Sequence, residues 1–78
     1  MFYVKAVKEE ESPTRVVYRF GDTDERLGRF ALERATGQAE LLEPLPCDAE
    51  GRLFERAAWK VQRAWQRGEV PAVAVWAS

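Results

Sequence analysis

The sequence predicts an α+β fold, a two-layer sandwich in which one helix packs on one face of a mostly antiparallel sheet of about five strands. Four stretches alternate apolar and polar residues with the period of a strand. A fifth stretch, residues 49–67, repeats its apolar residues with the period of a helix. An uncharged run follows the helix almost at once, so the helix must pack back on the sheet. The predicted order is β-β-β-β-α-β in a single domain, residues 1–78.

The first two strands are predicted at residues 2–8 and 14–20. In the second of these, Val16, Tyr18 and Phe20 fall on one side, while charged residues alternate with them. The segment between the two stretches holds three adjacent glutamates and a proline, which disfavour strand pairing. The two strands therefore form a hairpin.

Residues 27–34 and 38–43 predict a second hairpin. Gly37 suits the left-handed position of a type I turn with a G1 bulge. The loop between the two hairpins contains Asp22 and Asp24, a spacing found in calcium loops. It lacks the loop length, central glycine and distal glutamate of an EF-hand, so a turn is predicted there and no metal site.

The helix at 49–67 is predicted from one apolar stripe and from its end signals. Asp48 is expected to cap the first turn, and Gly68 and Pro71 mark the end. Gly51, inside the predicted first turn, lowers helix stability by about 1 kcal/mol relative to alanine. The stripe consists of Leu53, Phe54, Ala57, Ala58, Val61, Ala64 and Trp65.

The last predicted strand, residues 70–77, carries no charged side chain. Such a run is typical of a strand with both faces buried, or nearly so. A right-handed crossover through the helix makes this strand parallel to the fourth, though not necessarily its neighbour. The predicted core combines the helix stripe with one face of the strands. Its members are Val4, Val16, Tyr18, Phe20, Phe30, Leu32, Leu53, Phe54, Val61 and Trp65.

One helix covers only one face of such a sheet, so the opposite face is a candidate interface. The residues expected to lead this interface are Tyr3, Val17 and Trp76. The alternative is that the stems of long Arg and Lys side chains shield the apolar residues of this face.

A second candidate surface lies on the helix, opposite the apolar stripe. Trp59 sits there beside a basic ridge whose members are neighbours at spacings of four, three and four. The ridge consists of Arg56, Lys60, Arg63 and Arg67. It either binds a partner, including a single-stranded nucleic acid whose bases stack on Trp59, or it is a solvated face.

Composition excludes several kinds of chemistry. Histidine is absent, which removes Ser-His-Asp triads, Cys-His pairs and histidine metal ligands. Net charge is −1, so whole-protein charge does not favour nucleic acid. Cys47 alone forms no internal disulfide, which is typical of a reducing compartment. No signal peptide is recognisable, and no apolar run approaches the ~20 residues of a membrane span. We expect a cytoplasmic protein with no cofactor, metal or membrane partner.

The sequence favours a non-catalytic module that acts through protein–protein contact or self-association, with a homodimer as one possibility. Single-stranded nucleic-acid binding through Trp59 and its ridge is the first alternative. The second is a small enzyme or thiol-dependent protein that uses Cys47, which lies just before the helix N-terminus. No catalytic residue is predicted.

Overall fold

The structure is a computed structural model that describes residues 3–22 and 28–77. Within these ranges it contains five strands and one helix in the predicted order, which confirms the α+β sandwich. The elements are β1 (Tyr3–Glu11), β2 (Arg15–Gly21), β3 (Gly28–Glu33), β4 (Ala39–Glu43), α1 (Arg52–Gln66) and β5 (Val73–Ala77).

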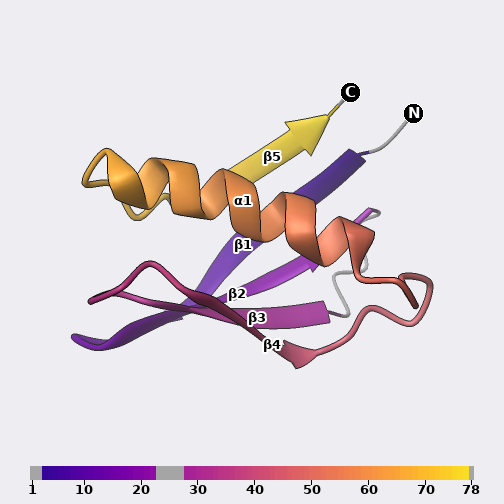
Figure 1. Cartoon of the computed structure of the whole chain (residues 1–78), viewed down its shortest axis with the longest axis horizontal. Coiled ribbons are helices and arrows are strands. Elements are labelled where there is room, and N and C mark those ends of the chain that lie inside the picture. Colours follow the sequence, from indigo (N-terminus) through magenta and orange to yellow (C-terminus); the bar gives the residue numbers. More distant parts are fainter. Residues whose placement is uncertain (1–2, 23–27, 78) are drawn as a thin grey trace.

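The strands form one antiparallel sheet in the spatial order β4-β3-β2-β1-β5. The first four strands pair with their neighbours in sequence, and β5 pairs with the remaining side of β1. Helix α1 crosses one face of the sheet and connects the two edges (Figure 1). Because each strand is antiparallel to its neighbour, β5 runs in the same direction as β4, as predicted, from the opposite edge of the sheet.

Helix α1 begins three residues later than the predicted start at residue 49, because Gly51 adopts a left-handed conformation with φ of 74°. The Asp48 carboxylate still satisfies the free amide groups of the first turn. Its two oxygens accept hydrogen bonds from the N–H groups of Leu53 and Phe54, both at 3.1 Å. The predicted destabilisation by glycine inside the first turn is therefore wrong, since Gly51 lies outside the helix.

The helix ends at Gln66, one residue before the predicted end, in a Schellman motif. Gly68 takes a left-handed conformation, with φ of 83°, and its N–H donates to the Trp65 carbonyl at 2.9 Å. The N–H of Glu69 donates to the Ala64 carbonyl, also at 2.9 Å. The predicted glycine stop signal is confirmed.

The core lies between α1 and the face of the sheet that it covers. Tyr18 and Phe30 stack at 5.4 Å between ring centroids, and Phe54 packs edge-on against Phe30 at 5.8 Å. The predicted core is confirmed, with Phe54 and Trp65 partly rather than fully buried. The buried predicted members are Val4, Val16, Tyr18, Phe20, Phe30, Leu32, Leu53 and Val61.

The turn between β3 and β4 is fixed to the helix. Gly37 has a φ of 78°, which confirms its predicted left-handed position, and its N–H donates to the Glu33 carbonyl at 2.8 Å. The indole N–H of Trp65 donates to the Arg34 carbonyl at 2.9 Å. The Gln62 side-chain amide donates to the Gly37 carbonyl at 2.9 Å. These bonds hold the β4 edge against α1.

Asp24 and most of the loop predicted as a turn rather than a calcium site lie outside the described residues. Among residues 3–22 and 28–77, no group of three or more Cys, Asp or Glu side chains is placed to hold a metal ion.

Candidate association surface

Strand β5 is an edge strand, and the prediction that both of its faces are buried is wrong. Its side chains alternate between exposed and partly buried, and Val73 and Val75 are exposed. The reason is the order of the sheet: the four-strand meander leaves only the outer sides of β1 and β4 free, so β5 can be added only at an edge.

The outer side of β5 presents unpaired backbone groups. The Lys8 N–H donates to the Ala72 carbonyl at 2.8 Å, and the register makes these two residues a directly opposed, hydrogen-bonded pair. Such pairs recur at every second residue along an antiparallel ladder. The N–H and C=O groups of Val73, Val75 and Ala77 therefore point away from β1, and no strand in the described part of the chain pairs with them.

An apolar patch lies beside this edge, on the face of the sheet that α1 leaves uncovered. In the register, Tyr3 lies opposite Ala77 and Val7 lies opposite Val73. Opposed residues share a face, so these side chains and Val75 lie together with Lys5, which is opposite Val75 and brings one charged group into the patch. Tyr3, Val73 and Val75 are exposed, which supports the prediction that Tyr3 belongs to an open apolar surface.

The other half of the uncovered face carries a network of ion pairs. Arg29 bonds Glu9 at 2.6 Å and Glu43 at 2.8 Å, and Arg19 also bonds Glu9. The hydrogen bond from Arg19, with that from Arg29, lowers the pKa of the Glu9 carboxyl below its ordinary value. A shift in the register of β1 between Lys8 and Glu10 inserts Glu9 as an extra residue, which places it in this network.

Val17 lies in this charged half, and its predicted role in an interface is wrong because only 2% of its surface is exposed. Its opposed neighbour Ala31 is buried as well. Two residues away on each strand, the same face carries long side chains, including those of Arg15, Arg19 and Arg29. Their stems shield the smaller residues, which is the alternative that the sequence left open.

Trp76 does not lie on the uncovered face, so its predicted place there is also wrong. The register sets Trp76 opposite Val4, a buried residue beneath α1. Its indole is partly buried against the core, and the Arg56 guanidinium lies 4.9 Å from the ring centroid. Trp76 therefore stands on the helix side of β5, at the edge of the sheet.

The predicted ridge divides between two tryptophans. Arg56 lies over Trp76, whereas the Arg63 guanidinium lies 5.3 Å from the centroid of the exposed Trp59 ring. Lys60 and Arg67 are exposed on α1. A shallow hollow next to β5 brings the two tryptophans together. It is lined by Arg52, Glu55, Arg56, Trp59 and Trp76.

Cys47 is exposed in the connection between β4 and α1. It lies in a shallow hollow with Asp48 and Glu50. The Asp48 carboxylate is already engaged in capping α1. The structure brings no lysine to this thiol among the residues that line the hollow.

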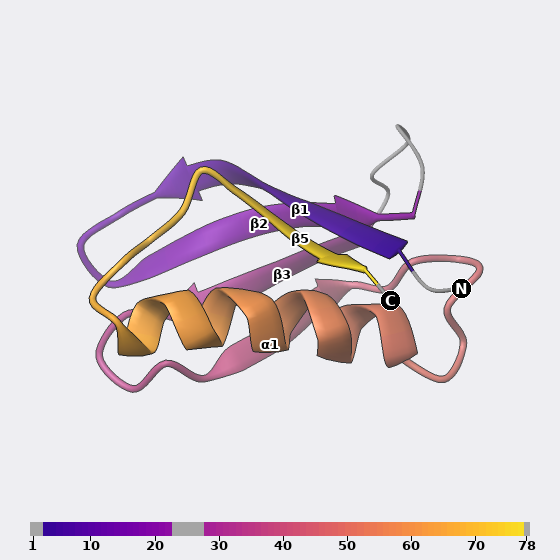
Figure 2. The same cartoon turned by 90° about the horizontal axis from the view of Figure 1, so that it is seen from above.

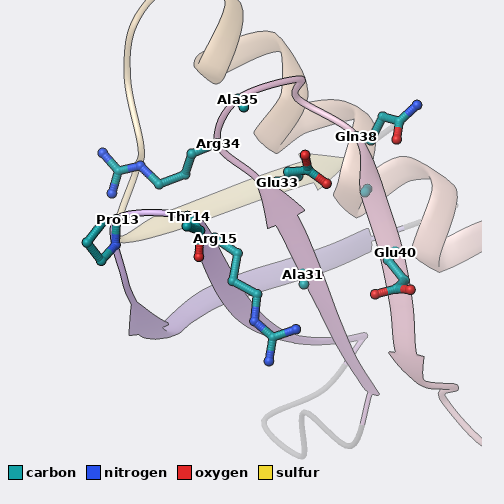
Figure 3. Close-up of a pocket in the computed structure, with 10 residues that line it drawn as sticks. Pro13, Thr14, Arg15, Ala31, Glu33, Arg34, Ala35, Gln38 and Glu40 are labelled. Atoms are coloured by element: carbon teal, nitrogen blue, oxygen red, sulfur yellow. The ribbon is translucent and has the colours of Figure 1, made fainter.

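A further hollow, which the sequence did not predict, lies at the end of the β3–β4 hairpin (Figure 3). Arg15, Glu33 and Glu40 line it, and Figure 3 shows Arg34 turned away from both glutamates. The Arg34 guanidinium instead bonds the Glu11 carboxylate at 2.7 Å. The charged side chains labelled in this hollow point in different directions (Figure 3).

Comparison with protein-family models, with curated proteins and with solved structures finds no match for this chain. In the part of the chain that the structure describes, no helix has the length and apolar character needed to cross a membrane.

Proposed function

We propose that this protein is a small, non-catalytic association module that binds another polypeptide chain along the outer edge of β5. The single observation that carries the proposal is an uncharged edge strand whose outward N–H and C=O groups are unpaired within the described residues. We further propose that it acts in the reducing cytoplasm, as its single cysteine suggests.

Edge strands are templates for pairing, and proteins that remain monomeric usually block them with charge, proline or bulges. Within β5 there is no charged side chain and no proline, and its register with β1 is unbroken over all five residues. An extended strand that adds to such an edge gains main-chain hydrogen bonds along its length. The chemistry of β5 therefore favours pairing.

The side chains around β5 add apolar area to this backbone edge. Tyr3 and Val75 are exposed on one face of it, and Trp76 and Trp59 line the hollow on the other. Tyrosine and tryptophan are enriched at the centres of protein interfaces because they bury large surfaces with few rotatable bonds. A bound chain would therefore contact aromatic side chains on both faces of the sheet.

In-cell photo-crosslinking tests this proposal. A photoreactive amino acid replaces Val75 on the β5 edge or, as a matched control, Leu41 on the β4 edge. These two side chains have nearly equal exposure, 39% and 37%. We expect a cross-linked product of higher mass from position 75 and little or none from position 41, with the second chain identified by mass spectrometry. Absence of any product at position 75, or equal products at both, would overturn the proposal.

Single-stranded nucleic-acid binding is the second candidate, favoured by the exposed Trp59 ring with the Arg63 guanidinium over it, and by the exposed Lys60 and Arg67 on the same helix. Adding a single-stranded oligonucleotide at low salt should then quench tryptophan fluorescence. Trp59→Ala should weaken binding by about 1–3 kcal/mol, and affinity should fall steeply with salt. Unchanged fluorescence would remove this candidate.

A further inference from the structure

We infer that the strand received by the β5 edge is β5 of a second copy of this chain. The two strands pair antiparallel about a two-fold axis, with Val75 of one copy opposite Val75 of the other. This inference rests on the proposed function of the β5 edge, and it adds the identity of the partner and the register of the pair.

The backbone of β5 is complementary to itself in this register. The residues that point their N–H and C=O groups outward are Val73, Val75 and Ala77. When Val75 faces Val75, Val73 of each copy faces Ala77 of the other. Every outward-facing residue of β5 then belongs to a hydrogen-bonded pair. A register centred elsewhere leaves part of the edge unpaired.

The side chains favour the same register. Between the hydrogen-bonded pairs, Ala74 of each copy faces Trp76 of the other on the helix side of the sheet. Side chains in such non-hydrogen-bonded pairs approach closely, so a large indole beside a single methyl group fits well. A register centred on Trp76 would instead set two indole rings against each other.

The distribution of charge favours a second copy over a charged partner. A two-fold axis places residues near it beside their own duplicates, so any charge there repels itself. The whole run of residues 70–77 is free of charge and therefore meets this requirement. It also offers no charge that would select an oppositely charged partner strand.

This pairing joins two five-stranded sheets into one continuous sheet. Because the two-fold axis is perpendicular to the sheet, both helices lie on the same face. Figure 2 shows β5 and β1 side by side, with α1 along the sheet. The exposed Tyr3 and Val75 of both copies lie together on the opposite face, with Lys5 beside Val75 in each copy. Trp59 lines the hollow that holds Trp76, so both copies present it near the junction.

Solution mass and cysteine cross-linking test the inference on the full chain. Light scattering should give twice the 8.9 kDa of one chain. In a Cys47→Ser background, Val75→Cys should form a disulfide-linked dimer on mild oxidation, because opposed Cα atoms about 5.5 Å apart suit a disulfide. Val73→Cys is the matched control. Its two copies would lie about 13 Å apart along the strands, too far to link.

Failure of self-pairing and failure of the proposed function would give different results. A monomer at all concentrations overturns self-pairing, and the proposed function then stands or falls on whether photo-crosslinking at position 75 captures a different protein. A dimer that links through Val73→Cys and not through Val75→Cys overturns the register. A dimer in which neither variant links overturns the β5–β5 junction.

Discussion

The two edges of the sheet have the same length and opposite chemistry. Both β4 and β5 contain five residues. The β4 edge carries Glu40 and Glu43, both exposed, and Pro44 follows directly. Its pairing with β3 also contains a register shift. Each of these features is a known protection against pairing between edges. Strand β5 has none of them, and its exposed side chains are those of Val73, Val75 and Ala77.

Exposure of apolar side chains alone does not distinguish the two edges. Leu41 on β4 is exposed nearly as much as Val75 on β5, yet Glu40 precedes it and Glu43 follows two residues later. Identical strands paired across the β4 edge would bring these carboxylates close together. Of the two edges, β5 is the one whose outward backbone groups lie in an uncharged strand with an unbroken register.

The largest effects should come from proline substitutions in β5, because they distinguish the N–H groups that face β1 from those that face outward. The Ala74 N–H points toward β1, so Ala74→Pro removes a ladder bond and should lower the free energy of unfolding by about 3 kcal/mol. The Val75 N–H points outward, so Val75→Pro should leave stability almost unchanged and abolish association. Urea unfolding and light scattering of both variants check this. Equal destabilisation by the two prolines would contradict the assigned backbone directions.

Gly37→Ala should destabilise the turn that holds the β4 edge against α1. A Cβ atom at this position would lie 2.5 Å from the Trp65 ring, and the φ of 78° is unfavourable for alanine. We expect a loss of about 2 kcal/mol in urea unfolding, with self-association retained because the site lies at the other edge. Loss of the dimer at concentrations where the variant is folded would show that the two edges are not independent.

Tyr18→Phe should destabilise the segment that leads from α1 into β5, because the Tyr18 hydroxyl donates a hydrogen bond to the Pro71 carbonyl at 2.7 Å. The free energy of unfolding should fall by about 1 kcal/mol, the contribution of one hydrogen bond, and urea unfolding measures it.

Burial raises the pKa of Tyr18 to about 12, from an ordinary value of 10. Between pH 10 and 12 the unfolded chain therefore loses this proton and the folded chain keeps it. The free energy of unfolding should fall there by about 1.4 kcal/mol per pH unit.

Unfolding curves of the wild type and of Tyr18→Phe at pH 8, 10 and 11.5 measure this loss of stability. Tyr18→Phe lacks the titrating group and serves as the control for other groups that ionise in alkali. Parallel losses of stability in both proteins would contradict the role assigned to the Tyr18 hydroxyl.

Local periodicity in the sequence was enough to predict the order of elements, the turn at Gly37 and the core stripe of α1. Each of these depends on residues close together in the chain. The sequence could not place β5, because an uncharged run suits a central strand and an unprotected edge equally well. Only the pairing of β5 with β1 decides between them.

The same limit explains the errors among the predicted interface residues. The face on which Trp76 lies follows from its register opposite Val4, which is a tertiary property. The burial of Val17 depends on arginine stems from its own and the neighbouring strand, in a network completed by Glu9 at a register shift. The exposure of Tyr3 could be predicted because it follows from strand alternation alone, and its role in an interface stays a prediction.

The most direct test of the contrast between the edges is the solution mass of three proteins: the wild type, Val75→Lys and Leu41→Lys. Each variant places one positive charge on an edge strand at a side chain of similar exposure. The wild type and Leu41→Lys should be dimers, whereas Val75→Lys should be a monomer, since two lysines would meet at the two-fold axis. Equal masses for all three proteins would contradict the account of the β5 edge as the association surface.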